Sequence, residues 1–304
     1  IPSQNIKHGE SFFFISGTYT IKNKEEKILI SLKKGEKKIL KKNNKTYNRF
    51  SDHIGVIPLV IISPDDRNLI IEGSETRRKF IDGIICQTDK VYLNNLIDYN
   101  KTLKQRNALL KMSIKNLENL KKTVDVYDNQ MSLKAQDIFN KRLKFLEEFI
   151  PIFKLRYMQL SNNLEEVEII FKSDITESQS LYKLLKESIE KDIRLQFTTK
   201  GIHKDDINFK INDFSIKKFG SQGQQKTFLI ALKLAQFDYL SKLDSNPILL
   251  LDDIFDKLDD NRVKQIINLV NEEKFNQIFI SDTNKSRSEN IIKKANKSYK
   301  IFEI

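Results

Sequence analysis

The chain has 304 residues, with 53 basic and 41 acidic side chains and a formal net charge of +12. This length predicts about two domains, and a hydrophobic content of 39 % is enough for a packed core, which excludes a disordered chain. The longest apolar run, residues 54–62, is far shorter than the roughly 20 residues of a membrane-spanning helix, which excludes a spanning segment.

The N-terminal part of the chain has the pattern of strands. Residues 12–21 and 27–32 are β-branched and aromatic runs separated by polar residues. A nearly continuous apolar run at 55–62 predicts a strand that is covered on both faces. It ends in Ser63-Pro64-Asp65-Asp66, where Ser63 suits an N-cap and Asp66 the third helical position, so a helix is expected to begin there.

The middle of the chain has the pattern of long helices. Apolar residues recur at three- and four-residue steps from Ser74 to about Leu120, and again from Ser132 to Ser161. Pro151 is expected to interrupt the second helix, and the irregular residues 123–129 are expected to join the two. The pattern fits an antiparallel arm or an ordinary helical subdomain, and periodicity does not separate these.

The C-terminal part has shorter segments that change type. Strands are expected at 167–172, 193–199 and 207–211, with a helix at 178–192. From Ser221 onward helices alternate with strands, and these strands are expected at 248–251, 277–280 and 299–302. Such alternation predicts a parallel sheet with helices on its faces.

The segment 247–253 reads Pro-Ile-Leu-Leu-Leu-Asp-Asp. Its aliphatic residues are typical of a buried parallel strand, and two carboxylates follow at the carboxyl end, where open α/β sheets bind ligands. A Walker B strand has this pattern: one carboxylate holds Mg²⁺ beside nucleotide phosphates, and its neighbour orients or deprotonates the attacking water. By position, Asp252 is assigned to Mg²⁺ and Asp253 to the water. The alternative is a strand that merely ends in an acidic turn.

The segment 219–227, Phe-Gly-Ser-Gln-Gly-Gln-Gln-Lys-Thr, is a glycine- and serine-rich turn that opens a long helix. The start of a helix offers free backbone N–H groups and the positive end of its dipole to a phosphate. Gly220 and Gly223 let a phosphate approach the backbone, and Ser221 adds a hydroxyl. The alternative is that Ser221 simply caps the helix.

The order of these segments adds information, because Asp256-Lys257-Leu258-Asp259 and a further strand follow them. This is the layout of an ABC-type ATPase head, with signature helix, Walker B strand, D-loop and switch strand. Ser-Gln-Gly-Gln-Gln at 221–225, with Leu-Leu-Asp-Asp and Leu-Asp downstream, resembles the RecF family of bacterial recombination-repair ATPases. Four further stretches across the chain also resemble the family, with Ile202 and Lys204 as substitutions in the last: 62–66, 77–82, 103–110 and 201–206.

The resemblance implies an α/β fold, in which an ABC-type ATPase head of P-loop NTPase type, with a parallel sheet and helices, carries an inserted helical lobe or arm. Residues 1–75 would form the N-terminal part of the head, and residues 76–165 the lobe. Residues 166–304 would form the C-terminal part, with the signature helix and Walker B.

The resemblance also implies how ATP is bound. In ABC-type heads, ATP at Walker A and B of one subunit meets the signature helix of the other, so ATP and Mg²⁺ are the expected cofactors. The residues expected at the nucleotide or its interface are Ser221, Gly223, Gln224 and, in the D-loop, Asp259. Asp252 is then the metal ligand and Asp253 the catalytic base, although many ABC proteins have Glu at this position. The switch histidine of transporters is absent from 279–283.

One departure from the family concerns Walker A. No Gly-x-x-x-x-Gly-Lys-Ser/Thr occurs in the sequence. RecF proteins carry this loop ahead of the part that resembles residues 1–20, and the chain begins with Ile1. Truncation before or through the loop is therefore expected, with ATP hydrolysis absent from the chain alone and slow in the intact protein.

The implied function is that of an ATP-dependent recombination mediator in DNA repair, replication restart and the SOS response. It would bind gapped and single-stranded DNA, form an ATP-dependent homodimer, contact RecR, and help RecO and RecR to load RecA. The basic surplus agrees with sequence-independent DNA binding, and no RNP-type stretch or Cys/His finger indicates base reading. One cysteine and no leader segment favour a cytoplasmic location without membrane contact.

Three alternatives remain open. A non-hydrolysing DNA-binding scaffold of the same fold would keep Walker B as a relic. An SMC- or Rad50-like chromosome protein would need far longer coiled coils than the roughly 90 residues of helix here. A transporter ATPase subunit is not expected to carry such a helical insertion.

The histidines and the cysteine are read as structural. His8, His53 and His203 are scattered without metal-ligand spacing, and His203 is expected in a turn. Cys86 is expected as a small buried hydrophobe.

Overall fold

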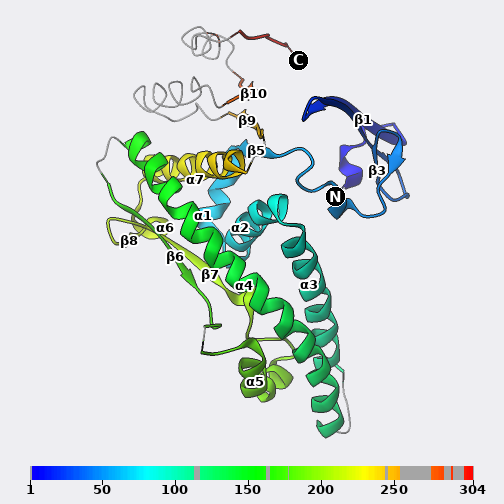
Figure 1. Cartoon of the computed structure of the whole chain (residues 1–304), viewed down its shortest axis with the longest axis vertical. Coiled ribbons are helices and arrows are strands. Elements are labelled where there is room, and N and C mark those ends of the chain that lie inside the picture. The colour runs from blue at the N-terminus through cyan, green and yellow to red at the C-terminus, as the bar shows by residue number, and fades with distance from the viewer. Residues whose placement is uncertain are drawn as a thin grey trace. The chain divides into compact units, whose positions relative to one another are not determined.

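The computed structural model describes residues 2–112, 117–161, 165–176, 178–243, 246–253, 275–283, 289 and 298–303 (Figure 1). The chain divides into two compact units, residues 1–57 and 58–304. Among the described residues, no helix combines the length and apolar character that crossing a membrane requires.

The N-terminal unit is an antiparallel sheet. Its strands pair in the order of the sequence: β1 (Phe12–Ile21), β2 (Lys24–Lys33), β3 (Ile39–Lys42) and β4 (Lys45–Thr46). Lys22 and Asn23 connect β1 to β2 with φ of 49° and 61°, a two-residue turn whose twist matches that of the strands. The predicted strands at 12–21 and 27–32 are confirmed. The short 3₁₀ helices η1 (Pro2–Asn5) and η2 (Phe50–His53) complete the unit.

The second unit contains the predicted parallel sheet. Its order is β10 (Ile278–Ser281), β9 (Ile248–Asp252), β5 (Leu59–Ile62), and both pairings are parallel. On one face the side chains of Val60, Ile62, Leu249 and Leu251 are buried, and helix α7 (Gln222–Lys242) packs on β5.

Three strand predictions at this sheet need correction. The first strand was expected to be covered on both faces, but the side chains of Leu59 and Ile61 on its second face are exposed. The strand expected at 55–62 begins only at Leu59, because Gly55 has φ of 79° and Pro58 has no N–H for a ladder bond. The strand expected at 299–302 is wrong. Residues 298–303 are all exposed, so this apolar run gains no burial that would favour a strand.

Three long helices follow the first strand of the parallel sheet: α2 (Ser74–Thr88), α3 (Lys90–Leu110) and α4 (Leu117–Ser161). The single helix predicted from Ser74 is broken at Asp89, whose extended backbone lets its carboxylate accept a 2.8 Å bond from the N–H of Tyr92. Residues 123–129 and Pro151 lie inside α4, contrary to prediction, because the side chains of Val124, Phe149 and Phe153 are buried there.

Helices α3 and α4 form an antiparallel arm, as Figure 1 shows. Three contacts show that the two helices run in opposite directions, because residue numbers rise along α3 while they fall along α4. The contacts are Asp89 with Lys141, Asn95 with Asp137, and Arg106 with Asp128. Helix α5 (Leu181–Leu195) packs on α4 at the far end of the arm, around Leu110, Leu120 and Val124. Of the two alternatives left open, the described residues form the antiparallel pair, but its helices are α3 and α4 and not the two stretches predicted on either side of 123–129.

A second sheet in this unit is antiparallel and consists of β6 (Val167–Lys172), β7 (Asp206–Ile211) and β8 (Phe214–Ser215). The strand predicted at 193–199 is wrong, since α5 continues to Leu195 and ends at Gln196 with φ of 61°. The remaining short elements are η3 (Pro64–Arg67), α1 (Asn68–Ile71), η4 (Ile202–Lys204) and α6 (Ile216–Phe219). At the start of η3, the Ser63 N–H donates to the Asp66 carboxylate at 2.8 Å.

Candidate functional site

The first half of the candidate site is the start of α7. Ser221 is its N-cap, and the Ser221 hydroxyl oxygen accepts a 3.2 Å bond from the backbone N–H of Gln224. In return the N–H of Ser221 donates to the Gln224 side-chain oxygen at 2.7 Å. This reciprocal capping box satisfies two N–H groups and leaves those of Gln222 and Gly223 for a ligand. Because the hydroxyl acts here as an acceptor, its proton can still be donated.

The backbone ahead of Ser221 is tightly packed. The N–H of Gly220 donates to the carbonyl oxygen of Ile216 at 3.0 Å, and a Cβ on Gly220 would lie 2.7 Å from that oxygen. The side-chain amide of Gln225 donates to the carbonyls of Ile216 and Gly220 at 3.2 and 3.0 Å. Only glycine fits at 220, and the turn is held in one conformation.

The electrostatics of this turn favour an anion. Ser221 and Gln222 are exposed, so the positive end of the α7 dipole meets solvent. Lys217 and Lys218 are exposed in the last turn of α6, directly before it. Backbone N–H groups, a hydroxyl and nearby ammonium groups together suit a phosphate.

The second half of the candidate site is the carboxyl end of the parallel sheet. Asp252 is the last residue of β9 and is exposed. Ser281, the last residue of β10, stands opposite it in the parallel register, and its hydroxyl donates to the Asp252 carboxylate at 2.5 Å. The bond orients one carboxylate oxygen at the strand edge where α/β sheets bind ligands.

Asp253 directly follows the last residue of β9. Its backbone has φ of 46°, in the left-handed region, and its N–H donates to the carbonyl oxygen of Ser281 at 3.1 Å. Aspartate tolerates this conformation better than most residues, and such positions are concentrated at functional sites. Asp259, the predicted D-loop residue, lies outside the described residues.

The two halves have separate hydrogen-bond partners. Ser221 and Gln224 bond each other, whereas Asp252 bonds Ser281. Across the described parts of the chain, no group of three or more His, Cys, Asp or Glu side chains could enclose a metal ion. The carboxylates of Asp252 and Asp253 do offer the hard oxygen donors that Mg²⁺ prefers, with phosphate and water supplying the rest.

Two residues of the site were missed by the sequence reasoning. Ser281 could have been found from the parallel register, because it ends the strand beside Asp252. Glu165 gave no local signal. Its carboxylate accepts a 2.6 Å bond from the side-chain amide of Gln224, 59 residues away, and a second bond from the Tyr157 hydroxyl.

Two of the other family-like stretches, 77–82 and 201–206, form structural contacts with each other. Arg77 forms a 2.9 Å ion pair with Asp206, and Arg78 donates to the carbonyl oxygen of Asp205 at 2.6 Å. His203 lies 2.8 Å from the Tyr99 hydroxyl and 3.1 Å from the carbonyl oxygen of Thr198. Burial lowers the pKa of His203 to about 4, so it is neutral at pH 7 and fits the structural turn that was expected.

Known proteins with similar sequences were found, although no family model matches this sequence. "DNA replication and repair protein RecF" of Flavobacterium johnsoniae is 54 % identical over 302 residues, covering 99 % of this chain and 84 % of the relative. The protein of the same name from Phocaeicola vulgatus is 48 % identical, covering 100 % of this chain and 82 % of the relative.

Two solved structures are also similar to this chain. A structure of the recombination mediator protein RecF with ATP, in the RecFOR pathway, matches with a TM-score of 0.82 and 30 % identity, covering 93 % of this chain and 78 % of that one. An Smc head domain from Pyrococcus furiosus matches with a TM-score of 0.50 and 16 % identity, over 93 % of this chain and 73 % of that one. The second similarity concerns the fold alone.

Proposed function

Because the chain belongs to the RecF family of DNA replication and repair proteins and has the ABC-type ATPase head fold, we propose that it acts as an ATP-dependent recombination mediator on gapped and single-stranded DNA. The observation that carries the proposal is the pair of half-sites, one suited to phosphate at the start of α7 and one suited to Mg²⁺ at the carboxyl end of β9. A relative solved with ATP supports the same cofactor here.

In this proposal one ATP is shared between two copies of the chain. The helix start of one copy binds the terminal phosphate through the Ser221 hydroxyl and the N–H groups near Gly223, while Gln224 keeps the turn in place. Asp252 of the other copy would hold Mg²⁺, which supplies charge neutralisation at the phosphates when bound. Asp253 would orient and deprotonate the attacking water, and Asp259 is the residue that we assign to the D-loop at the interface.

ATP binding also needs a loop for the β- and γ-phosphates, which this sequence lacks. The proposed activity therefore belongs to a polypeptide that carries this chain together with a Walker A loop, and weak ATP hydrolysis is expected of that polypeptide only. All tests below use the complete product of the gene.

The proposed domain organisation places the helical lobe inside the head. Strand β5 precedes the lobe in the sequence and β9 follows it, yet the two strands are neighbours in one parallel sheet. This pairing supports a head composed of 1–75 and 166–304 with residues 76–165 inserted.

The proposed partners follow from charge and from the relatives. A net charge of +12 favours contacts with the DNA backbone, which are independent of sequence. The solved relative belongs to the RecFOR pathway, which supports RecR as a direct partner and RecO and RecA as partners in the pathway. The proposed location is the cytoplasm, where these partners act on DNA.

Two substitutions test the proposal. Asp253→Asn should slow hydrolysis while keeping ATP-dependent dimers, and Ser221→Arg should block dimerisation while leaving ATP binding by the monomer largely intact. Hydrolysis is measured by phosphate release and dimerisation by light scattering. Wild-type turnover of the first variant, or normal dimers of the second, would contradict these roles. A complete gene product that binds no ATP would indicate the non-hydrolysing scaffold instead.

A further inference from the structure

Glu165 connects the start of α7 to the end of α4. One oxygen of its carboxylate accepts the 2.6 Å bond from the Gln224 side-chain amide, and the other accepts a bond from the hydroxyl of Tyr157. Tyr157 is completely buried near the end of α4, so the carboxylate is held from a rigid part of the molecule. The Gln224 side chain is thereby fixed at both ends, by Glu165 through its nitrogen and by the Ser221 N–H through its oxygen.

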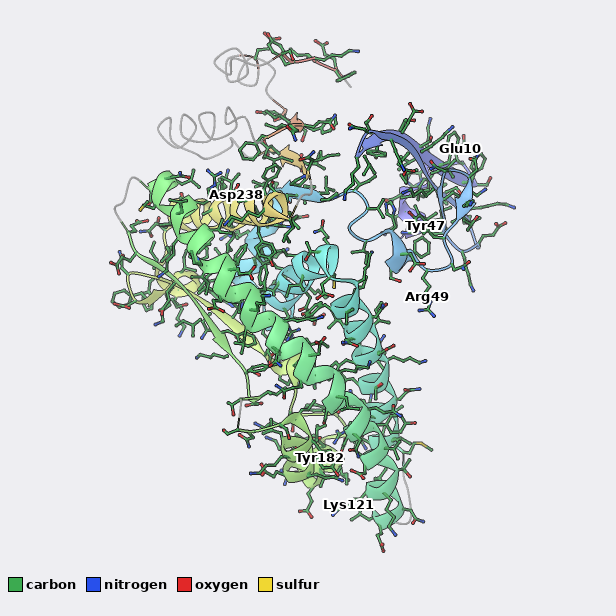
Figure 2. All side chains as sticks on the ribbon, in the orientation of Figure 1. Glu10, Tyr47, Arg49, Lys121, Tyr182 and Asp238 are labelled. Atoms are coloured by element: carbon green, nitrogen blue, oxygen red, sulfur yellow. The ribbon has the colours of Figure 1, made fainter. Side chains whose placement is uncertain are left out.

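The part of α4 from Phe145 to Tyr157 packs along α7. Aromatic rings pair in opposite order along the two helices: Phe145 with Tyr239 at 4.9 Å between ring centroids, Phe153 with Phe228 at 4.7 Å, and Tyr157 with Phe228 at 5.9 Å. Arg156 adds an ion pair with Asp238, labelled in Figure 2, at 2.6 Å. The two helices are therefore antiparallel and joined by contacts at both ends of this segment.

The opposite end of α4 belongs to the tip of the arm. Lys121, labelled in Figure 2, forms a 3.4 Å ion pair with Glu190 of α5, and Asp128 forms a buried 2.6 Å pair with Arg106 of α3. The 45 residues of α4 span roughly 65 Å. One continuous helix thus extends from the arm tip to Tyr157, whose hydroxyl bonds the carboxylate that holds Gln224.

We propose that Glu165 is a positioning residue that sets the geometry of the phosphate-binding turn and makes that turn depend on the position of α4. Held by Tyr157, the carboxylate keeps the Gln224 amide where its oxygen caps Ser221. The N–H groups of Gln222 and Gly223 then keep one orientation. A shift of α4 along α7, caused by a ligand on the arm, would move this turn. The inference rests on the proposed function.

The chemistry of the carboxylate gives graded variants. Glu165→Ala removes both acceptors, so Gln224 loses its anchor. Glu165→Gln keeps an oxygen for the Gln224 amide and offers its own amide to the Tyr157 oxygen, so the geometry is retained without the charge. Tyr157→Phe removes one bond and keeps the ring packing on Phe228. The matched control is Glu166→Ala, because Glu166 is the adjacent residue and is exposed.

The experiment uses the complete gene product with ATP alone as the probe. Three quantities are compared for each variant: the ATP affinity of the monomer, the dissociation constant of the ATP-bound dimer, and the melting temperature. For Glu165→Ala we expect ATP-dependent dimerisation to weaken about tenfold or more, since two bonds to a charged group are lost, with unchanged ATP affinity of the monomer. Glu165→Gln and Glu166→Ala should dimerise as the wild type does. The dimer dissociation constant of Tyr157→Phe should lie between those of the wild type and Glu165→Ala. The double variant should dimerise as weakly as Glu165→Ala alone.

Each outcome is decisive. Equal dimerisation of Glu165→Ala and the wild type would overturn the positioning role and leave the proposed function standing. A wild-type protein that neither binds ATP nor dimerises with it would overturn both. If Glu165→Ala melts at a lower temperature than the wild type, its weaker dimerisation could reflect lost stability, and Tyr157→Phe is then the deciding variant. Dimerisation of Tyr157→Phe as strong as that of the wild type would contradict the positioning role of Glu165. A loss of monomer affinity for ATP equal to the loss in dimerisation would also overturn it.

Discussion

Ser281 and Asp252 end two neighbouring parallel strands at the same register position, and the Ser281 hydroxyl donates to the Asp252 carboxylate at 2.5 Å. The bond orients the acid that we assign to Mg²⁺. Ser281→Ala leaves this carboxylate free to rotate, so we expect the Mg²⁺ concentration for half-maximal ATP hydrolysis to rise about tenfold, a typical effect of losing an outer contact to a metal ligand. The control is Ser281→Thr, which keeps the hydroxyl. Equal Mg²⁺ dependence of the Ala variant and the wild type would show that Ser281 has no such role.

A buried arginine stabilises the arm. The Arg106 guanidinium is fully buried and lies 2.6 Å from Asp128 and 2.7 Å from Asp192. Arg106→Met leaves two carboxylates buried without their cation, and we expect the free energy of unfolding to fall by about 3–5 kcal/mol. Urea unfolding measures this change. The matched control is Lys122→Met, which removes an exposed pair with Glu118 and should change stability by less than about 0.5 kcal/mol. Similar losses for both variants would contradict the stabilising role of Arg106.

The buried His203 predicts a pH dependence of stability. Burial lowers the pKa of His203 to about 4 from 6.5, so between these values the unfolded chain takes up a proton that the folded protein does not. Stability therefore falls as the pH drops from 6.5 to 4, by at most roughly 3 kcal/mol from this residue. His203→Gln should lose less stability over this range than the wild type does, as measured by urea unfolding at a series of pH values.

Comparing His203→Gln with the wild type separates the effect of the histidine on the pH dependence of stability from the effect of its neighbour Asp205. Burial raises the pKa of Asp205 to about 6, and this carboxyl acts in the opposite sense over the same range. His8→Gln is the control, because His8 is exposed. An identical pH slope for His203→Gln and the wild type would contradict the assignment.

The basic surplus predicts how DNA binding responds to salt. Contacts between ammonium groups and phosphates release counterions, so the logarithm of the affinity should fall linearly with the logarithm of the salt concentration, with a slope steeper than about −3. Fluorescence anisotropy with gapped DNA in the presence of ATP measures the slope. Two unrelated sequences of the same gapped structure should bind equally. An affinity that stays constant as salt is raised severalfold would contradict backbone-dominated binding.

Features set by local sequence could be predicted correctly. The cap at Ser221 depends on a residue three positions away, and the β9 strand on a run of aliphatic residues, so both were evident from the sequence alone. The antiparallel direction of the arm follows from its two helical stretches. The turn expected at His203 is present as η4, and the role of this histidine stays a prediction.

Features set by tertiary contacts could not be predicted in this way. The break at Asp89 depends on a carboxylate that caps the next helix. Residues 123–129 are helical because Val124 packs in a cluster with Ile189 and Ile193 of α5. Glu165 meets Gln224 only after the end of α4 is packed against α7, and no nearby residue indicates this contact. Propensity and periodicity carry no information about partners so distant in sequence.

The central claim is that two copies of the protein share each ATP, and a mixture of two inactive variants tests it most directly. Ser221→Ala removes the hydroxyl that binds the phosphate but not the small side chain that dimerisation needs, and Asp253→Asn removes the proposed base, so neither homodimer has an intact site. A dimer with one copy of each has one intact site, composed of the turn from one copy and the acids from the other. We predict that an equimolar mixture hydrolyses ATP at up to about a quarter of the wild-type rate, the value for random pairing in a two-fold dimer. A mixture as inactive as its two components would contradict the shared site.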